Sequence, residues 1–140
     1  MKKQILFYIF LFFIILSPIS SLDLIDSTDK IDNISPPNWI FGTWILDDDE
    51  EWDVPFIVEF TKDDIIMDLL MDPGSMEEYI AEEIIIAFNQ NITEEYYEIY
   101  VKFESEEWFK ERFFIASGDV MESKFIDSDG MEEDYTYYRN

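Results

Sequence analysis

The second half of the chain alternates between apolar and polar residues, and this pattern constrains the fold more than any other feature. Over 96–103 and 108–116 apolar side chains occupy the odd-numbered positions, with Glu111 as the exception. A side-chain period of two is that of a β-strand with one buried face. The turns at 117–119 and 128–130 contain Gly, which supplies the positive φ that tight hairpins require. The pattern therefore predicts consecutive antiparallel hairpins.

Similar short β-rich runs occur from residue 39 onward, separated by polar clusters at the spacing of a meander. The predicted strands cover 39–46, 56–61, 65–71, 83–90, 96–103, 108–116, 120–127 and 131–139. Ser75 and Glu78 have the spacing of a capping box, which predicts one short helix near 76–82, with a single turn as the alternative. We expect an all-β fold: an eight-stranded antiparallel up-and-down barrel, which leaves no exposed edge. A two-sheet sandwich is the alternative.

The amino-terminal residues have the order of a secretory signal peptide. Lys2 and Lys3 precede an apolar run over 5–16, and small or turn-forming residues follow over 17–21. Twelve apolar residues would span about 18 Å as a helix, against about 30 Å of hydrocarbon. We expect cleavage after Ser21 and no stable membrane span afterwards, so that the protein is exported to the periplasm or the extracellular space. An uncleaved anchor is the alternative.

The predicted organisation is a signal peptide over 1–21, a flexible acidic arm over 22–37 and a single β domain over 38–140. The mature chain would keep all 33 acidic residues and seven of the nine basic ones, which gives a net charge of −26. Such a field repels phosphate backbones and anionic lipid surfaces. We therefore expect no nucleic acid partner, and a basic or apolar surface on any protein partner. Because 48% of the residues are hydrophobic, the chain is expected to fold despite its charge.

The chain contains neither histidine nor cysteine. It cannot build a Ser-His or Cys-His nucleophile pair, a thiolate site or a His-bound zinc site. Proximity of carboxylates is expected by chance among so many acidic residues, so we predict no enzymatic activity and no cofactor. The acidic runs at 47–51 and 127–130 lack the full spacing of a calcium loop, and we interpret them as a solvated loop and a hairpin turn.

A Gly-x-Trp motif lies on the first predicted strand as Gly42-Thr43-Trp44. With this motif and the strand pattern that follows, the chain resembles the lipocalin-like group of small secreted β-barrels, in particular the short bacterial members. The resemblance implies that Gly42 allows close backbone approach, that Trp44 closes one end of the barrel, and that Arg139 packs on Trp44. It also implies binding of a small apolar ligand or a scaffolding role. The family's disulfide and its Thr-Asp-Tyr motif are absent.

Two functions remain open at this point. An aromatic stripe faces the predicted interior and consists of Tyr97, Phe103, Phe109, Phe113 and Phe125. In the first hypothesis these side chains line a cavity for a small hydrophobic molecule. In the second they fill the barrel, and the protein acts through its surface as an interaction or structural module.

Overall fold

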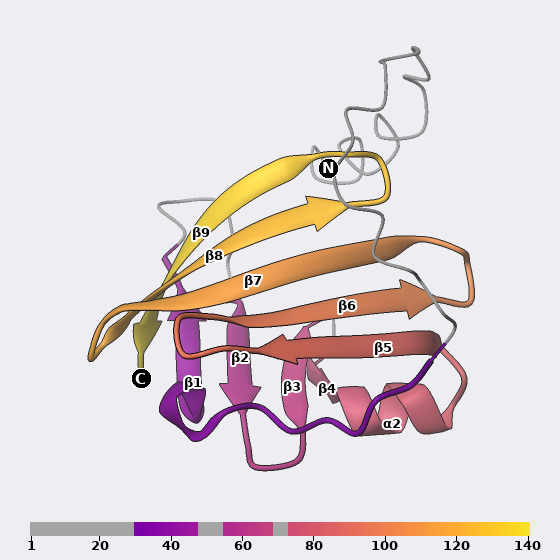
Figure 1. The fold of residues 1–140 in the computed structure, drawn as a ribbon, viewed down its shortest axis with the longest axis horizontal. Coiled ribbons are helices and arrows are strands. Elements are labelled where there is room, and N and C mark those ends of the chain that lie inside the picture. The colour runs from indigo at the N-terminus through magenta and orange to yellow at the C-terminus, as the bar shows by residue number, and fades with distance from the viewer. Residues whose placement is uncertain (1–29, 48–54, 69–72) are drawn as a thin grey trace.

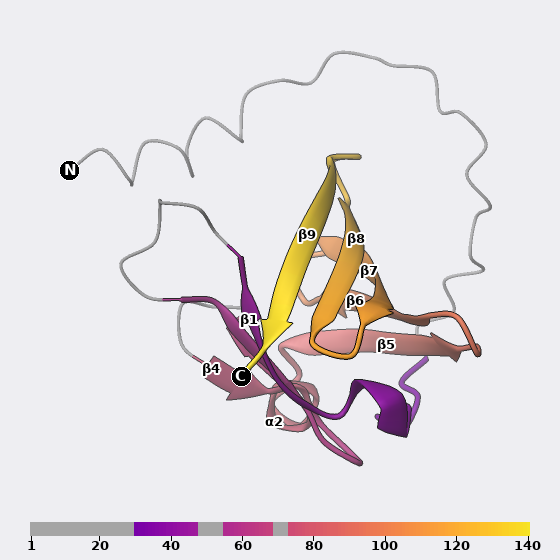
Figure 2. The same ribbon diagram turned by 90° about the vertical axis from the view of Figure 1, so that its left-hand side faces the viewer.

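A computed structural model of the chain describes residues 30–47, 55–68 and 73–140. The strands in these residues are β1 (Gly42–Leu46), β2 (Ile57–Phe60), β3 (Ile65–Asp68), β4 (Pro73–Ser75), β5 (Ile85–Ile92), β6 (Tyr97–Phe103), β7 (Trp108–Ser117), β8 (Val120–Asp127) and β9 (Glu132–Arg139). They form one antiparallel sheet in the order β4-β3-β2-β1-β9-β8-β7-β6-β5. The sheet curls into a half-barrel (Figures 1 and 2).

The all-β antiparallel meander is confirmed, but the eight-stranded closed barrel is wrong in two respects. A ninth strand, β4, forms at Pro73–Ser75, between the predicted strand over 65–71 and the predicted helix, because Ser75 pairs with Ile66 in β3. The edge strands β4 and β5 are not neighbours in the sheet. Helix α2 (Met76–Ala81) connects them and packs against β3, β4 and β5. The chain thus covers the gap in the barrel with a helix. One continuous sheet also replaces the sandwich alternative.

The short helix near 76–82 is confirmed, and its start is set by side-chain capping. The Ser75 hydroxyl accepts a 3.2 Å hydrogen bond from the Glu78 backbone N–H, as the capping spacing predicts. Asp64, in the turn between β2 and β3, accepts a further 3.1 Å hydrogen bond from the Glu77 N–H. Met76, the first residue of the helix, is fully buried. These contacts fix α2 across the open side of the sheet.

The outer edge of β5 is paired with the segment that precedes the barrel. Ile31 forms a parallel bridge with Phe88, whose carbonyl accepts a 2.8 Å hydrogen bond from Asp32 N–H and whose own N–H donates to the Lys30 carbonyl. Residues 30–37, the described part of the predicted arm, run beside this strand (Figure 1). Because an unpaired edge is a template for aggregation, this pairing protects the sheet.

The hydrophobic core lies on the inner face of the curled sheet. The largest fully buried aromatic side chains are Trp44, Tyr97, Phe60, Phe88 and Phe113. A short 3₁₀ helix, η1 (Asn38–Ile40), leads into β1 and buries Ile40 in the same core. The odd-numbered positions of β6 and β7 face this core, as the alternation predicts, and the even-numbered positions form the outer face. The inner and outer faces of β6–β9 are therefore two separate candidate surfaces.

Candidate ligand-binding site on the inner face

One end of the half-barrel brings together Gly42, Trp44 and Arg139, and we call it the closed end. The indole Nε1 of Trp44 donates a 2.8 Å hydrogen bond to the Ile40 carbonyl. The Arg139 guanidinium carbon lies 4.2 Å from the centroid of the Trp44 ring, and its Nη1 donates to the Phe41 carbonyl over 2.8 Å. Gly42 has φ +123°, and a Cβ there would lie 2.9 Å from Arg139 Nη1. Only glycine suits this approach.

Two residues of the predicted stripe, Tyr97 and Phe113, lie behind the closed end. Their ring centroids are 6.3 Å apart, and Phe60 of β2 contacts both at 6.1 and 5.1 Å. All three are essentially inaccessible to solvent. The Tyr97 hydroxyl donates a 2.9 Å hydrogen bond to Gln90 Oε1, and burial raises the pKa of Tyr97 above its usual value. These side chains fill the interior at this end of the molecule.

The other three residues of the stripe lie at the opposite end of the sheet and form a continuous row of rings with Tyr135. The centroids of neighbouring rings in the order Phe103, Phe109, Phe125, Tyr135 are 6.1, 5.5 and 6.1 Å apart. We call these four residues the aromatic ladder, and this end of the molecule the open end. Phe109 is buried, whereas the other three rings are only partly buried. The ladder crosses β6, β7, β8 and β9 and offers accessible apolar surface.

Glu111 lies on the inner face of β7, between the ladder residue Phe109 and the deeply buried Phe113. Its side chain is only 5% exposed. Oε1 accepts hydrogen bonds from Ser123 Oγ at 2.5 Å and from the Tyr137 hydroxyl at 3.2 Å. Burial raises the pKa of Glu111 to about 7, although both hydrogen bonds oppose that shift. Burial and the adjacent Glu111 charge also raise the pKa of Tyr137.

Sequence reasoning missed Glu111 and Tyr135 as site residues. The signal for Glu111 was present, because a carboxylate interrupts the apolar positions of an otherwise regular alternation. Tyr135 was obscured by the acidic residues at 132–134, which mask the alternation of the last strand. The register of β8 and β9 places Tyr135 opposite Ser123, and so on the inner face.

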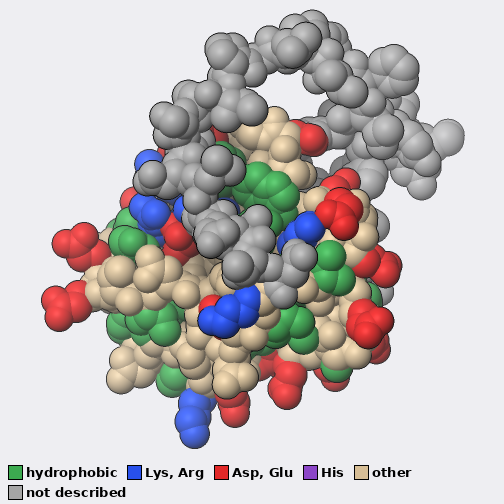
Figure 3. All heavy atoms as spheres, turned by 45° about the vertical axis from the view of Figure 1, so that its right-hand side comes forward, with side chains coloured by type: hydrophobic (Ala, Val, Ile, Leu, Met, Phe, Trp, Pro, Cys, Tyr) green, Lys and Arg blue, Asp and Glu red, His purple; other side chains and the backbone are tan. Residues whose placement is uncertain are grey.

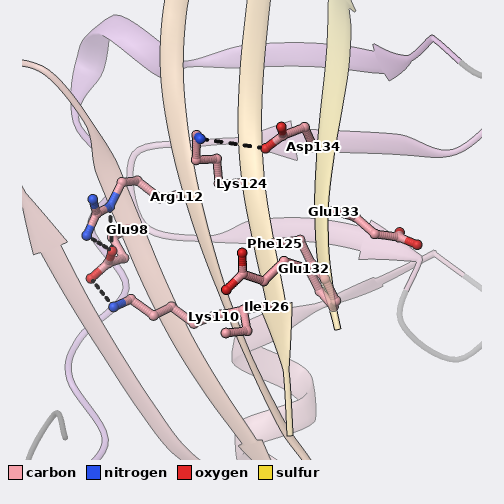
Figure 4. A pocket seen from close by; sticks show the side chains of 9 residues that line it. All are labelled: Glu98, Lys110, Arg112, Lys124, Phe125, Ile126, Glu132, Glu133 and Asp134. Carbon is pink, nitrogen blue, oxygen red and sulfur yellow. Dashed lines mark hydrogen bonds and ion pairs between the residues drawn. The ribbon is translucent and has the colours of Figure 1, made fainter. Parts of the chain in front are cut away.

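The outer face of β6–β9 carries a charged cluster centred on Glu98. Arg112 donates to Glu98 Oε2 through both Nε and Nη2 at 2.6 Å, and Lys110 Nζ lies 3.3 Å from Oε1 (Figure 4). The Arg112 guanidinium also stacks 4.3 Å from the centroid of the Tyr96 ring. A surface hollow of about 360 Å³ borders the cluster. Its lining residues are Glu98, Lys110, Arg112, Lys124, Phe125, Ile126, Glu132, Glu133 and Asp134.

The described part of the acidic runs has the geometry of turns. Asp127 Oδ1 accepts hydrogen bonds from the backbone N–H groups of Asp129 and Met131, both over 3.0 Å, which closes the β8–β9 hairpin. Most of the run at 47–51 lies outside the described residues. Within 30–47, 55–68 and 73–140, no group of three or more acidic side chains is arranged to hold a metal ion.

Comparison with known proteins found no matching family model, no similar curated protein and no similar solved structure. The architecture itself is that of an all-β antiparallel half-barrel, which is consistent with a calycin-like fold. None of the helices in the described residues has the length and apolar character needed to cross a membrane. The geometry of the two faces is therefore what bears on function.

Proposed function

We propose that this chain is an exported, lipocalin-like binding domain that holds a small, mainly apolar molecule against the aromatic ladder at its open end. The observation that carries the proposal is the row of four contacting rings, of which Phe103, Phe125 and Tyr135 remain partly accessible. Export is inferred from the signal-like residues 1–21, and the lipocalin-like assignment from the Gly42, Trp44 and Arg139 arrangement.

The difference between the two ends supports this position for the ligand. Tyr97 and Phe113 are already covered by protein side chains, so they contribute to the wall behind the site. The ladder rings have apolar area still to bury, and burying it releases about 25 cal/mol per Å². The ladder rings meet in tilted, stacked and edge-to-face arrangements, and the same arrangements are favourable with the ring of an aromatic ligand. The proposed ligand is therefore small and lies against Phe103, Phe125 and Tyr135.

Titration with the neutral, environment-sensitive probe N-phenyl-1-naphthylamine tests this function. We expect saturable binding to the mature protein, weakened at least about tenfold by Phe125→Asp, because a charge placed in an apolar contact is costly to desolvate. The matched control is Phe114→Asp, which makes the same substitution on the outer face of β7. Absence of probe binding by the folded protein, or equal weakening by both variants, would contradict the proposal.

A second function is a surface interaction module, and it depends on the outer face. Tyr100 and Trp108 pair there at 5.7 Å beside the basic residues Lys110 and Arg112. Figure 3 shows one face of the molecule, where hydrophobic side chains are exposed among acidic and basic ones. If the protein acts through this face, Lys110→Glu abolishes capture of a partner while probe binding at the ladder is unchanged. In either function, the net charge makes nucleic acid an unsuitable partner.

A further inference from the structure

The charged residues of β6–β9 are sorted by sign between the two faces of the sheet. Every basic residue of β6, β7 and β8 occupies an even-numbered position, and the strand registers place these positions on the outer face. These residues are Lys102, Lys110, Arg112 and Lys124. The only base on the inner face of these four strands is Arg139, which is held against Trp44 at the closed end.

The inner face around the ladder carries carboxylates instead. Glu111 is buried beside Phe125, its register partner in β8. Asp127, opposite Phe109, and Glu133, opposite Phe125, also occupy positions on the inner face. Glu133 accepts a hydrogen bond from the Tyr135 hydroxyl. Burial raises the pKa of Tyr135, and the hydrogen bond to Glu133 and the charges of all three carboxylates raise it further. The open end therefore combines aromatic rings with negative charge.

Residues of three strands, β6, β8 and β9, surround the Glu111 side chain. From β6 it faces Ile99, and from β8 it faces Phe125 and the hydroxyl of Ser123. From β9 the Tyr137 hydroxyl donates a hydrogen bond to it, and Tyr135, which donates to Glu133, lies on the same face. No Lys or Arg of the described β6–β9 residues serves as a counter-ion to Glu111.

We infer that the ligand at the aromatic ladder is a cationic amphiphile, an amine with an aromatic or apolar body, and that Glu111 is the group that pairs with its charge. This inference depends on the proposed function. Aromatic faces attract cations through their quadrupole, and an ionised carboxylate forms a strong charge-assisted hydrogen bond to an ammonium group. The negative field of the whole protein raises the local concentration of cations further.

Calorimetric titration with three matched molecules tests the inference: 1-naphthylmethylamine, 1-naphthylmethanol and 1-naphthoic acid. At pH 8 we expect the amine to bind at least about tenfold more tightly than the neutral alcohol, and the anion to bind weakest. Glu111→Gln should remove the preference for the amine while the alcohol still binds. Glu122→Gln is the matched control, because it removes one carboxylate from the exposed outer face of β8.

A measurement on the unmodified protein keeps the test independent of how Glu111→Gln folds. In a carboxyl carbon NMR titration, the amine should lower the pKa of Glu111, whereas the alcohol should not, because only a cation stabilises the ionised form. Equal affinities for amine and alcohol, or an unchanged Glu111 titration with bound amine, would overturn the inference alone. Failure of all three molecules to bind would overturn both the inference and the proposed function.

Discussion

The closed and open ends of the half-barrel share β6, β7 and β9 but differ in how far their aromatic residues are buried. At the closed end, Trp44, Tyr97 and Phe113 are fully buried and contact one another or Arg139. At the open end, Phe103 and Phe125 retain exposed surface. Rings of the same chemical type are thus fully buried at one end and retain accessible surface at the other.

Position along the strand, and not residue type, separates the fully buried aromatic rings from the accessible ones. Tyr97 and Phe103 lie on the same face of β6, six residues apart, yet only Tyr97 lies behind the closed end. Among the partly buried rings, Phe103 ends β6 and Phe125 lies near the end of β8, whereas Tyr135 lies in the middle of β9. This separation between buried and accessible rings has measurable consequences for stability.

The largest effect is expected from emptying the closed end. Trp44→Ala removes a fully buried indole and its hydrogen bond to Ile40, so it should lower the free energy of unfolding by about 3 to 5 kcal/mol. Phe103→Ala at the open end should cost only about 1 kcal/mol, because much less area becomes exposed. Chemical denaturation of both variants measures the difference. Similar losses would mean that packing does not distinguish the two ends.

A smaller effect on stability is expected when Glu111, which lies between the two ends, loses its proton. Its pKa rises from 4.5 in the unfolded chain to about 7 in the folded protein, so the folded state binds the extra proton between these values. The contribution of Glu111 to the free energy of unfolding is therefore greatest below about pH 4.5. About 3 kcal/mol of this contribution is lost as the pH rises from there through 7. Because other carboxylates titrate in the same range, the measurement is the difference between wild type and Glu111→Gln across pH 4 to 8. Parallel stability curves for the two proteins would refute the assignment.

The smallest effect tests the Arg139 contact with Trp44. Arg139→Lys keeps the charge but loses the planar stacking and the hydrogen bond to the Phe41 carbonyl, so it should cost about 1 kcal/mol. Lys124→Ala is the control, because its ion pair with Asp134 spans 3.9 Å between exposed side chains and should contribute less than about 0.5 kcal/mol. Thermal melting of both variants compares them. An equal shift in Tm would show that the stacking contact adds no stability.

Much of the architecture could be predicted from local sequence signals. The alternation over 96–103 and 108–116 specified which faces of β6 and β7 are buried, since a period of two admits only one inward set. The Ser75 cap predicted the start of α2. The ninth strand and the missing closure could not be predicted, because β4 depends on pairing with β3 and not on its own Pro-Gly-containing sequence.

The sequence by itself determined the antiparallel meander, the short helix and the inward direction of the five stripe residues, because turn chemistry and side-chain periodicity act over neighbouring residues. Only the tertiary structure decided which of these rings are sealed in and which form the ladder with Tyr135. It also decided that Glu111 meets Ser123 and Tyr137 in the interior, and that the basic residues gather on the opposite face. Those outcomes depend on sheet curvature and on contacts between distant strands, which no local pattern encodes.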